Sequence, residues 1–222
     1  MTDTSETTVR SSSGGNEGAA GAPPAALVAL RAATAERHEL LHEIMPLSVD
    51  SVALRDYLAH LQILRDWLEP LEAWLGTFSD GPQSPLLPAR INRLALIDAD
   101  LAHESALPQE RAASAASNVR RWQGGASAAY RWGVCYVIEG SQLGGAVLYA
   151  RLKDRLAPHP LGFLQAGRES LAARWQAFHR AMAAEVAHST LIDEACRGAA
   201  DAFDRLIELA RRPVTAACAN AD

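Results

Sequence analysis

The sequence has little lysine, little cysteine and no long apolar run, and each shortage excludes a class of protein. Lys153 is the only lysine among 21 basic residues. An anion bound by a side chain is therefore expected to meet arginine, whose guanidinium group suits carboxylates and phosphates. The net charge is −5, and the basic residues form no stripe. This distribution argues against a nucleic-acid-binding protein.

Cysteine usage and the lack of apolar segments favour a cytoplasmic protein. Cys135, Cys196 and Cys218 lie far apart and include no C-x-x-C pair, as is typical of reduced thiols. No apolar run approaches the roughly 20 residues of a membrane-spanning helix. Residues 2–24 are rich in Ser, Thr, Gly and Ala and have no apolar signal core. We interpret them as a disordered tail, and we expect no membrane partner.

Helical periodicity is what the sequence does contain, from Pro24 onward. Hydrophobic residues make up 49% of the chain, and many are alanine or leucine, which favour helix. No segment shows the period-two alternation of a strand. The apolar spacing predicts helices over residues 24–45, 51–75, 89–103, 127–156, 162–187 and 189–211, with a partly helical stretch at 108–123.

These helices predict an all-α, single-domain helical bundle. We expect a disordered N-terminal tail over residues 1–24, one helical domain over 25–212 and a C-terminal tail over 213–222. A domain of this size is large enough to bury a core. Gly76 is expected to cap its helix at the C-terminus. Ser189-Thr190, followed by Asp193 and Glu194, predicts a capping box at the start of the last helix.

The first predicted helix carries the motif H-E-x-x-H at residues 38–42. Two histidines four positions apart on a helix can bind one zinc ion, with the intervening Glu39 as a general base. A catalytic zinc needs a third protein ligand, and the longer signature with a third histidine is absent. The motif also arises often by chance, so two ordinary histidines remain an alternative. From this helix alone, both interpretations stay open.

A second motif lies inside the longest predicted helix, where residues 139–145 read E-G-S-Q-L-G-G. Each glycine inside a helix costs roughly 1 kcal/mol relative to alanine, so three of them require compensation. Gly140 and Gly144 have the spacing of a close helix–helix contact. Alternatively, the bare main chain allows close approach of a flat ligand. Gly145, next to Gly144, exceeds what one packing contact requires and favours the ligand.

Taken together, the two segments resemble the heme oxygenase family, especially its bacterial, phytochrome-associated branch. Residues 30–38 resemble the helix that carries the proximal heme ligand, with its A-T-x-x-x-H core at Ala33, Thr34 and His38. Residues 139–145 resemble the distal helix over the heme. Residues 175–182 resemble a later helix near the propionate groups. The similarity spans about residues 27–212 and implies the all-α fold of that family.

The resemblance assigns roles to particular residues. His38 is expected to bind the iron of a non-covalent b-type heme through Nε2, with His42 close to the heme but not a ligand. Arg31 lies seven residues before His38, about 10.5 Å along the same face, and is expected to pair with a propionate; Arg180 is a second candidate. The catalytic distal wall is expected to comprise Gly140, Ser141, Gly144 and Gly145. Animal relatives have aspartate where Ser141 stands, which leaves proton delivery and regiochemistry undetermined.

The resemblance also implies a reaction and its partners. Heme is both cofactor and substrate, and O₂ with external electrons converts it to biliverdin, CO and ferrous iron. An electron donor such as a ferredoxin or flavin reductase is implied, and a bacteriophytochrome is a candidate biliverdin acceptor. The alternatives are a non-catalytic heme or bilin carrier on the same fold, a zinc peptidase, and a bundle whose histidines and glycines serve only packing.

Overall fold

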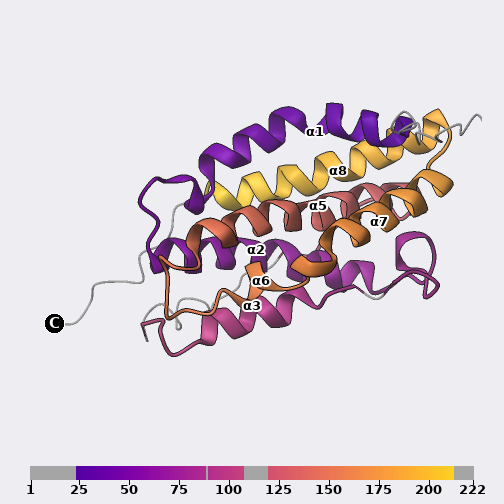
Figure 1. Ribbon diagram of the computed structural model, residues 1–222. Helices are drawn as coiled ribbons and strands as arrows, with labels where there is room; N and C mark the ends of the chain where they lie inside the picture. Colours follow the sequence, from indigo (N-terminus) through magenta and orange to yellow (C-terminus); the bar gives the residue numbers. More distant parts are fainter. Residues whose placement is uncertain (1–23, 89, 108–119, 213–222) are drawn as a thin grey trace, which may run out of the picture.

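The computed structural model describes residues 24–88, 90–107 and 120–212, and every regular element in these ranges is helical (Figure 1). The predicted all-α fold is confirmed. The α-helices are α1 (Ala25–Ile44), α2 (Leu54–Leu75), α3 (Arg93–Ala102), α5 (Ala128–Leu152), α6 (Gly162–Gln165), α7 (Leu171–Glu185) and α8 (Ser189–Ala210). Short 3₁₀ turns are η1 (Pro46–Ser48), η2 (Gly81–Gln83) and η3 (Arg168–Ser170).

Most predicted helices are present, with shifted ends. The helix predicted over 89–103 begins at Arg93, where Asn92 accepts a hydrogen bond from the Ala95 amide at 3.1 Å. The helix predicted over 127–156 ends at Leu152. Gly76 is the C-cap of α2, as predicted. Of the stretch predicted as partly helical, residues 108–119 lie outside the described residues and residues 120–123 are not helical.

Two local predictions are wrong. Residues 162–187 do not form one helix, because Gly167 adopts a left-handed conformation (φ 71°) that separates α6 from η3 and α7. The predicted capping box of the last helix is absent. His188 is the N-cap and makes no side-chain capping bond, while Glu194 instead accepts a hydrogen bond from Ser127, the N-cap residue of α5.

Helix α8 packs against both α1 and α5 (Figure 1). The α5–α8 contact is close because two glycines face opposite main chains. A Cβ atom on Gly133 would collide with the Ala195 carbonyl, and one on Gly198 would collide with the carbonyl of Tyr130. The small-residue contact that the sequence analysis considered for Gly140 and Gly144 therefore lies elsewhere on α5.

Helices α1 and α5 run in the same direction, each packed against α8 (Figure 1), and side-chain contacts link them at two points. At one end, the Tyr136 hydroxyl on α5 interacts with the side chains of Arg31 and Thr34 on α1. At the other, Arg151 of α5 donates a hydrogen bond to the carbonyl of Leu47, just after α1. Between these two contacts the helices run in the same direction over about the same length, so residues equally far from the first contact lie at about the same height. This register positions the candidate site.

Candidate functional site

One flank of α1 carries the histidines and Arg31. Because Thr34, Leu30 and Leu41 are buried against the bundle, the residues beside them lie at its edge. Arg31 and His38, seven residues apart, lie on one flank, and His42 lies one turn after His38. Arg37 lies on the opposite flank, where it forms an ion pair with Asp204 of α8 at 2.7 Å.

His38 is exposed and has no polar partner in the described part of the chain. Its ring makes an edge contact with Phe203 of α8, with 6.4 Å between the ring centroids. His42 is exposed as well, and its main-chain carbonyl accepts a hydrogen bond from the Ser48 hydroxyl. Both imidazoles are therefore accessible from solvent, and His38 is the one nearer the bundle.

The glycines of α5 face different surroundings. Tyr136, Gly140, Gly144 and Arg151 lie on the side of α5 that faces α1. A Cβ atom on Gly140 would lie 3.4 Å from the Trp175 ring of α7, whereas one on Gly144 would meet nothing within 4 Å. Gly144 is exposed. A protein side chain therefore lies at contact distance from position 140, and none lies near position 144.

Gly145 and Ser141 do not lie on the side of α5 that faces α1. A Cβ atom on Gly145 would make an ordinary contact with Leu164 of α6, at 3.7 Å. The Ser141 hydroxyl donates a hydrogen bond to the Ile138 carbonyl at 2.8 Å, although the residue is exposed. Leu143 and Val147 are exposed apolar residues on the side that faces α1, with 39% and 69% of their surface accessible.

The register of α1 and α5 places the exposed side of α1 that carries His38 level with the exposed side of α5 that carries Gly144. Starting from the Arg31–Tyr136 junction, seven residues along each helix lead to His38 on α1 and Leu143 on α5. Gly144 is the next residue. A rise of about 1.5 Å per residue is common to both helices. The predicted proximal histidine and the glycine without a packing partner therefore lie at about the same height on two helices that both pack against α8.

Aromatic side chains of α5 and α7 cluster near Arg31 of α1. Trp175 of α7 lies against Tyr136 and His179, with ring-centroid distances of 5.6 Å and 4.1 Å. Burial raises the pKa of Tyr136, and Arg31 opposes that change. Burial, followed by the charge of Arg31, lowers the pKa of His179, so its ring is neutral at neutral pH. Its Nε2 atom is buried without a hydrogen-bond partner among the described residues.

The sequence analysis did not identify Tyr136 or His179 as site residues. Tyr136 belongs to the glycine-rich helix, one turn before Gly140, so its position on that face could have indicated it. His179 stands next to Arg180, which was the predicted residue of this helix. Arg180 is exposed and lies off the side of α7 that carries Trp175 and His179.

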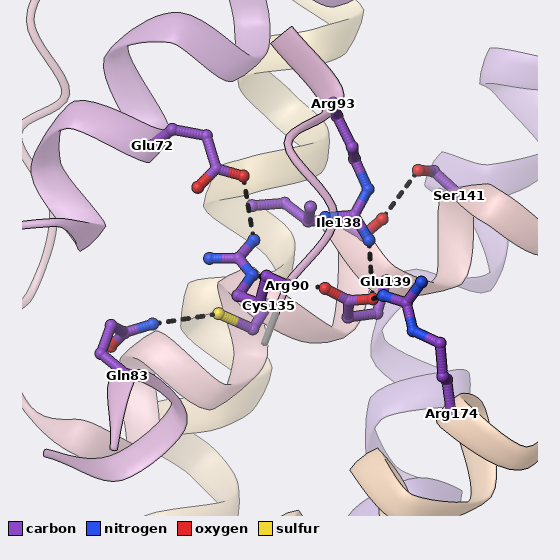
Figure 2. A network of polar contacts seen from close by, with 9 residues as sticks. All are labelled: Glu72, Gln83, Arg90, Arg93, Cys135, Ile138, Glu139, Ser141 and Arg174. Carbon is purple, nitrogen blue, oxygen red and sulfur yellow. Dashed lines mark hydrogen bonds and ion pairs between the residues drawn. The ribbon is translucent and has the colours of Figure 1, made fainter. Parts of the chain in front are cut away.

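A cluster of arginines surrounds Glu139 on another side of α5 (Figure 2). Its carboxylate accepts hydrogen bonds from Arg93 at 2.6 Å, Arg90 at 3.4 Å and Arg174 at 3.5 Å. Arg90 also pairs with Glu72 at 3.0 Å. Glu139 is thus directed into this cluster rather than toward α1.

Cys135, one turn before Glu139 on α5, lies beside this cluster and is fully enclosed. Burial raises the pKa of its thiol to about 11, and the Gln83 side chain donates to the sulfur at 3.4 Å (Figure 2). The thiol is therefore protonated at neutral pH and unsuited to act as a nucleophile or metal ligand.

The H-E-x-x-H motif gains no third ligand within the described residues. No three His, Cys, Asp or Glu side chains are grouped there in a way that could hold a metal ion. The exposed imidazole of His38 can nevertheless provide the one protein ligand that a heme iron requires. Over the same part of the chain, no helix is long and apolar enough to cross a membrane.

Comparison with known families agrees with this arrangement. The family description Heme oxygenase matches residues 25–212, a range that includes α1, the glycine-rich part of α5 and α7. No individual curated protein matches the sequence. Since the match covers most of the 222 residues, the chain belongs to the heme oxygenase family.

Proposed function

We propose that this protein is a catalytically active heme oxygenase. It binds a non-covalent b-type heme between α1 and α5 and cleaves it to biliverdin, CO and ferrous iron, using O₂ and external electrons. One observation carries the proposal: His38 and Gly144 are both exposed and lie level on parallel helices. A helical glycine costs roughly 1 kcal/mol relative to alanine, and a flat ligand near Gly144 explains why that cost is accepted.

The residues on the two helices fit a heme. His38 provides an imidazole nitrogen that no described protein group occupies. Arg31, about 10.5 Å away along α1, has no acidic partner in the described part of the chain, so its guanidinium is available to a propionate. Leu143 and Val147 offer exposed apolar side chains to a porphyrin face. Tyr136 and His179 add polar groups next to Arg31, at the end of the site where the propionates would lie.

The bound heme supplies both the iron that activates O₂ and the meso carbon that is oxidised. His38 would hold the heme iron through an imidazole nitrogen, a ligand that donates less electron density to iron than a thiolate would. On the distal side, Gly140 and Gly144 place main chain near the heme. Glu139 is engaged by three arginines, so it presents no carboxylic acid to the reacting centre.

Ser141 and Gly145 act behind the main-chain wall. The Ser141 hydroxyl, bonded to the Ile138 carbonyl, keeps its lone pairs available to accept a hydrogen bond from water. We assign it to water-mediated proton delivery in place of the aspartate of animal relatives. Gly145 lies beside Leu164 of α6, at a distance that leaves room for ordinary contact. His42 lies beside the heme without ligating it, and Arg180 is a secondary propionate partner.

The cellular setting that we propose is that of the bacterial, phytochrome-associated branch. The protein acts in the cytoplasm as one helical domain over residues 25–212, flanked by tails at 1–24 and 213–222. A ferredoxin or flavin reductase supplies electrons, and a bacteriophytochrome accepts biliverdin. The acidic net charge of −5 and the family match support a small-molecule substrate rather than a nucleic acid.

The deciding experiment is a heme titration of the full chain and of His38→Ala and His42→Ala, followed by reductant and air. The wild type is expected to give a Soret band of histidine-ligated heme that decays as a bilin spectrum appears. His38→Ala loses the ligand spectrum and turnover, whereas His42→Ala keeps the ligand. Stable heme without bilin formation would identify a carrier, and the absence of any heme spectrum would refute the proposal.

A further inference from the structure

The Glu139 carboxylate joins α5 to two other helices and a loop. Arg93 from α3 and Arg174 from α7 approach one oxygen at 2.6 Å and 3.5 Å, and Arg90, from the segment before α3, approaches the other at 3.4 Å (Figure 2). Only 14% of the Glu139 side chain is exposed. These contacts fix its position on α5 from three separate directions.

The cluster is poorly balanced as a source of stability. Its three arginines face two carboxylates, those of Glu139 and Glu72. Only 1% of the Arg93 side chain is exposed, and its Nε and Nη1 atoms have no hydrogen-bond partner among the described residues. Burying charged groups with unpaired N–H groups is costly. A geometric role accounts for the arrangement better than a contribution to folding free energy.

The cluster adjoins the glycine-rich segment at its first residue. Glu139 immediately precedes Gly140, and Arg174 immediately precedes Trp175, whose ring lies 3.4 Å from the Cβ position of Gly140. Helix α7 therefore holds α5 at two consecutive residues, once by charge and once by contact. Glycines contribute no side chains that could hold this segment in place, so the neighbouring residues must do so.

We propose that Glu139 is a positioning residue that sets the height and rotation of the Gly140–Gly144 main chain relative to His38. The inference rests on the proposed function. With the carboxylate in place, the main-chain wall covers the heme in one orientation, and oxidation is directed to one meso edge. Without it, Arg93 and Arg174 lose their common partner, and the glycine-rich segment shifts against α7.

Glu139→Gln tests this role, because it removes the charge at nearly constant shape. The matched control is Glu72→Gln, which removes the other carboxylate of the cluster without touching α5. Both variants are loaded with heme and compared with wild type by three measurements. These are the pH midpoint of the ferric heme spectrum, the ratio of biliverdin isomers, and the urea midpoint of the heme-free chain. The ferric spectrum reports the distal surroundings independently of turnover.

For Glu139→Gln, we expect the Soret band of the His38 complex to persist, the pH midpoint to shift by about half a unit or more, and the isomer ratio to change. Glu72→Gln should match wild type in both heme measurements. If both variants alter them equally, or if Glu139→Gln alters neither, the positioning role is refuted while the proposed function stands. If Glu139→Gln fails to fold, Arg174→Gln replaces it, with the same expected and refuting results. A wild-type chain that degrades no heme would refute the proposed function itself.

Discussion

Arg31 differs from the other arginine of α1 in its surroundings. Arg37 forms an ion pair with Asp204 at 2.7 Å, whereas Arg31 faces neutral groups, the Tyr136 hydroxyl and the His179 ring. Among the described residues, no carboxylate compensates its charge. A guanidinium with neutral neighbours can give its full charge and paired donors to an anionic ligand.

Replacing Arg31 by glutamine should therefore weaken heme binding by about tenfold, equivalent to about 1.4 kcal/mol. The Soret position should be unchanged, because the proposed iron ligand, His38, is retained. The measurement is a heme titration with Arg37→Gln as the matched control, since that residue lies on the other flank of the same helix. Equal affinities for wild type and Arg31→Gln would remove Arg31 from the site, and a larger loss in Arg180→Gln would move the propionate end to α7.

At this scale, the sequence predicted what lies on one helix but not what crosses between helices. The seven-residue spacing of Arg31 and His38 was sufficient to place them on one flank of α1. By contrast, Tyr136 and His179 meet Arg31 only because α5 and α7 pack beside α1. Likewise, the three arginines around Glu139 come from outside α5. Such contacts depend on tertiary packing, which local spacing does not encode.

Helix α5 contains glycines that serve different purposes. Gly133 allows close contact with the main chain of α8, Gly140 lies beside Trp175, and Gly145 lies near Leu164. Gly144 has no such neighbour. In the sequence these residues looked alike, and the choice between packing and ligand binding could not be made for each one. The structure gives a steric reason for glycine at 133, shows protein atoms at contact distance beside Gly140 and Gly145, and shows none beside Gly144.

Gly144→Ala should separate stability from function. The added methyl group meets no protein atom within 4 Å, so the heme-free chain should gain up to about 1 kcal/mol from helix propensity. Heme affinity and turnover should fall, because the methyl group would enter the space in which we propose that the porphyrin binds. The measurements are urea unfolding of the heme-free chain and a heme titration. Unchanged heme binding in this variant would contradict the placement of the ligand.

Gly133→Ala is the control for that experiment on the same helix. Its methyl group would collide with the Ala195 carbonyl, so it should lower the free energy of unfolding, by about 1–3 kcal/mol as overpacking typically does. The two substitutions are chemically identical and differ only in surroundings. Opposite effects on the stability of the heme-free chain are therefore the expected result.

The boundaries between elements were predicted less well than the elements themselves. Residues 162–187 have helical periodicity throughout, yet Gly167 at φ 71° interrupts them. Asp100 of α3 also holds this region, because its carboxylate accepts hydrogen bonds from the Gly162 and Phe163 amides at 3.0 Å and 2.9 Å. The Tyr57 hydroxyl donates to the same carboxylate. The amide contacts draw the chain onto α3, and they cannot be read from the periodicity of residues 162–187.

Across the whole molecule, two enclosed histidines link folding to pH. His60 on α2 is 8% exposed and His159, before α6, is 4% exposed. The His159 Nδ1 atom bonds to the Ser105 hydroxyl at 2.7 Å, but its Nε2 and the His60 Nδ1 have no hydrogen-bond partner among the described residues. Burial lowers the pKa of His60 to about 4 and also lowers the pKa of His159. Both rings are thus neutral in the folded chain.

The free energy of unfolding should consequently fall as the pH drops below 6.5. The unfolded chain protonates His60 near its ordinary pKa of 6.5, while the folded chain resists until about pH 4. Between these values, the unfolded state binds more protons and gains up to about 1.4 kcal/mol per pH unit, about 3 kcal/mol in total. The stability contribution is complete above pH 6.5, declines through this window and changes no further below pH 4.

His60→Gln tests the source of this acid sensitivity, because glutamine keeps a polar group and does not titrate. The measurement is urea unfolding of the heme-free chain at several pH values from 7.5 to 4. The variant should lose much of the decline seen in wild type, whereas His188→Gln, at an exposed position, should retain it. If His60→Gln declines as steeply as wild type, the sensitivity arises at the other histidines whose pKa burial lowers, His159 and His179. Protonation of His159 would disturb its bond to Ser105.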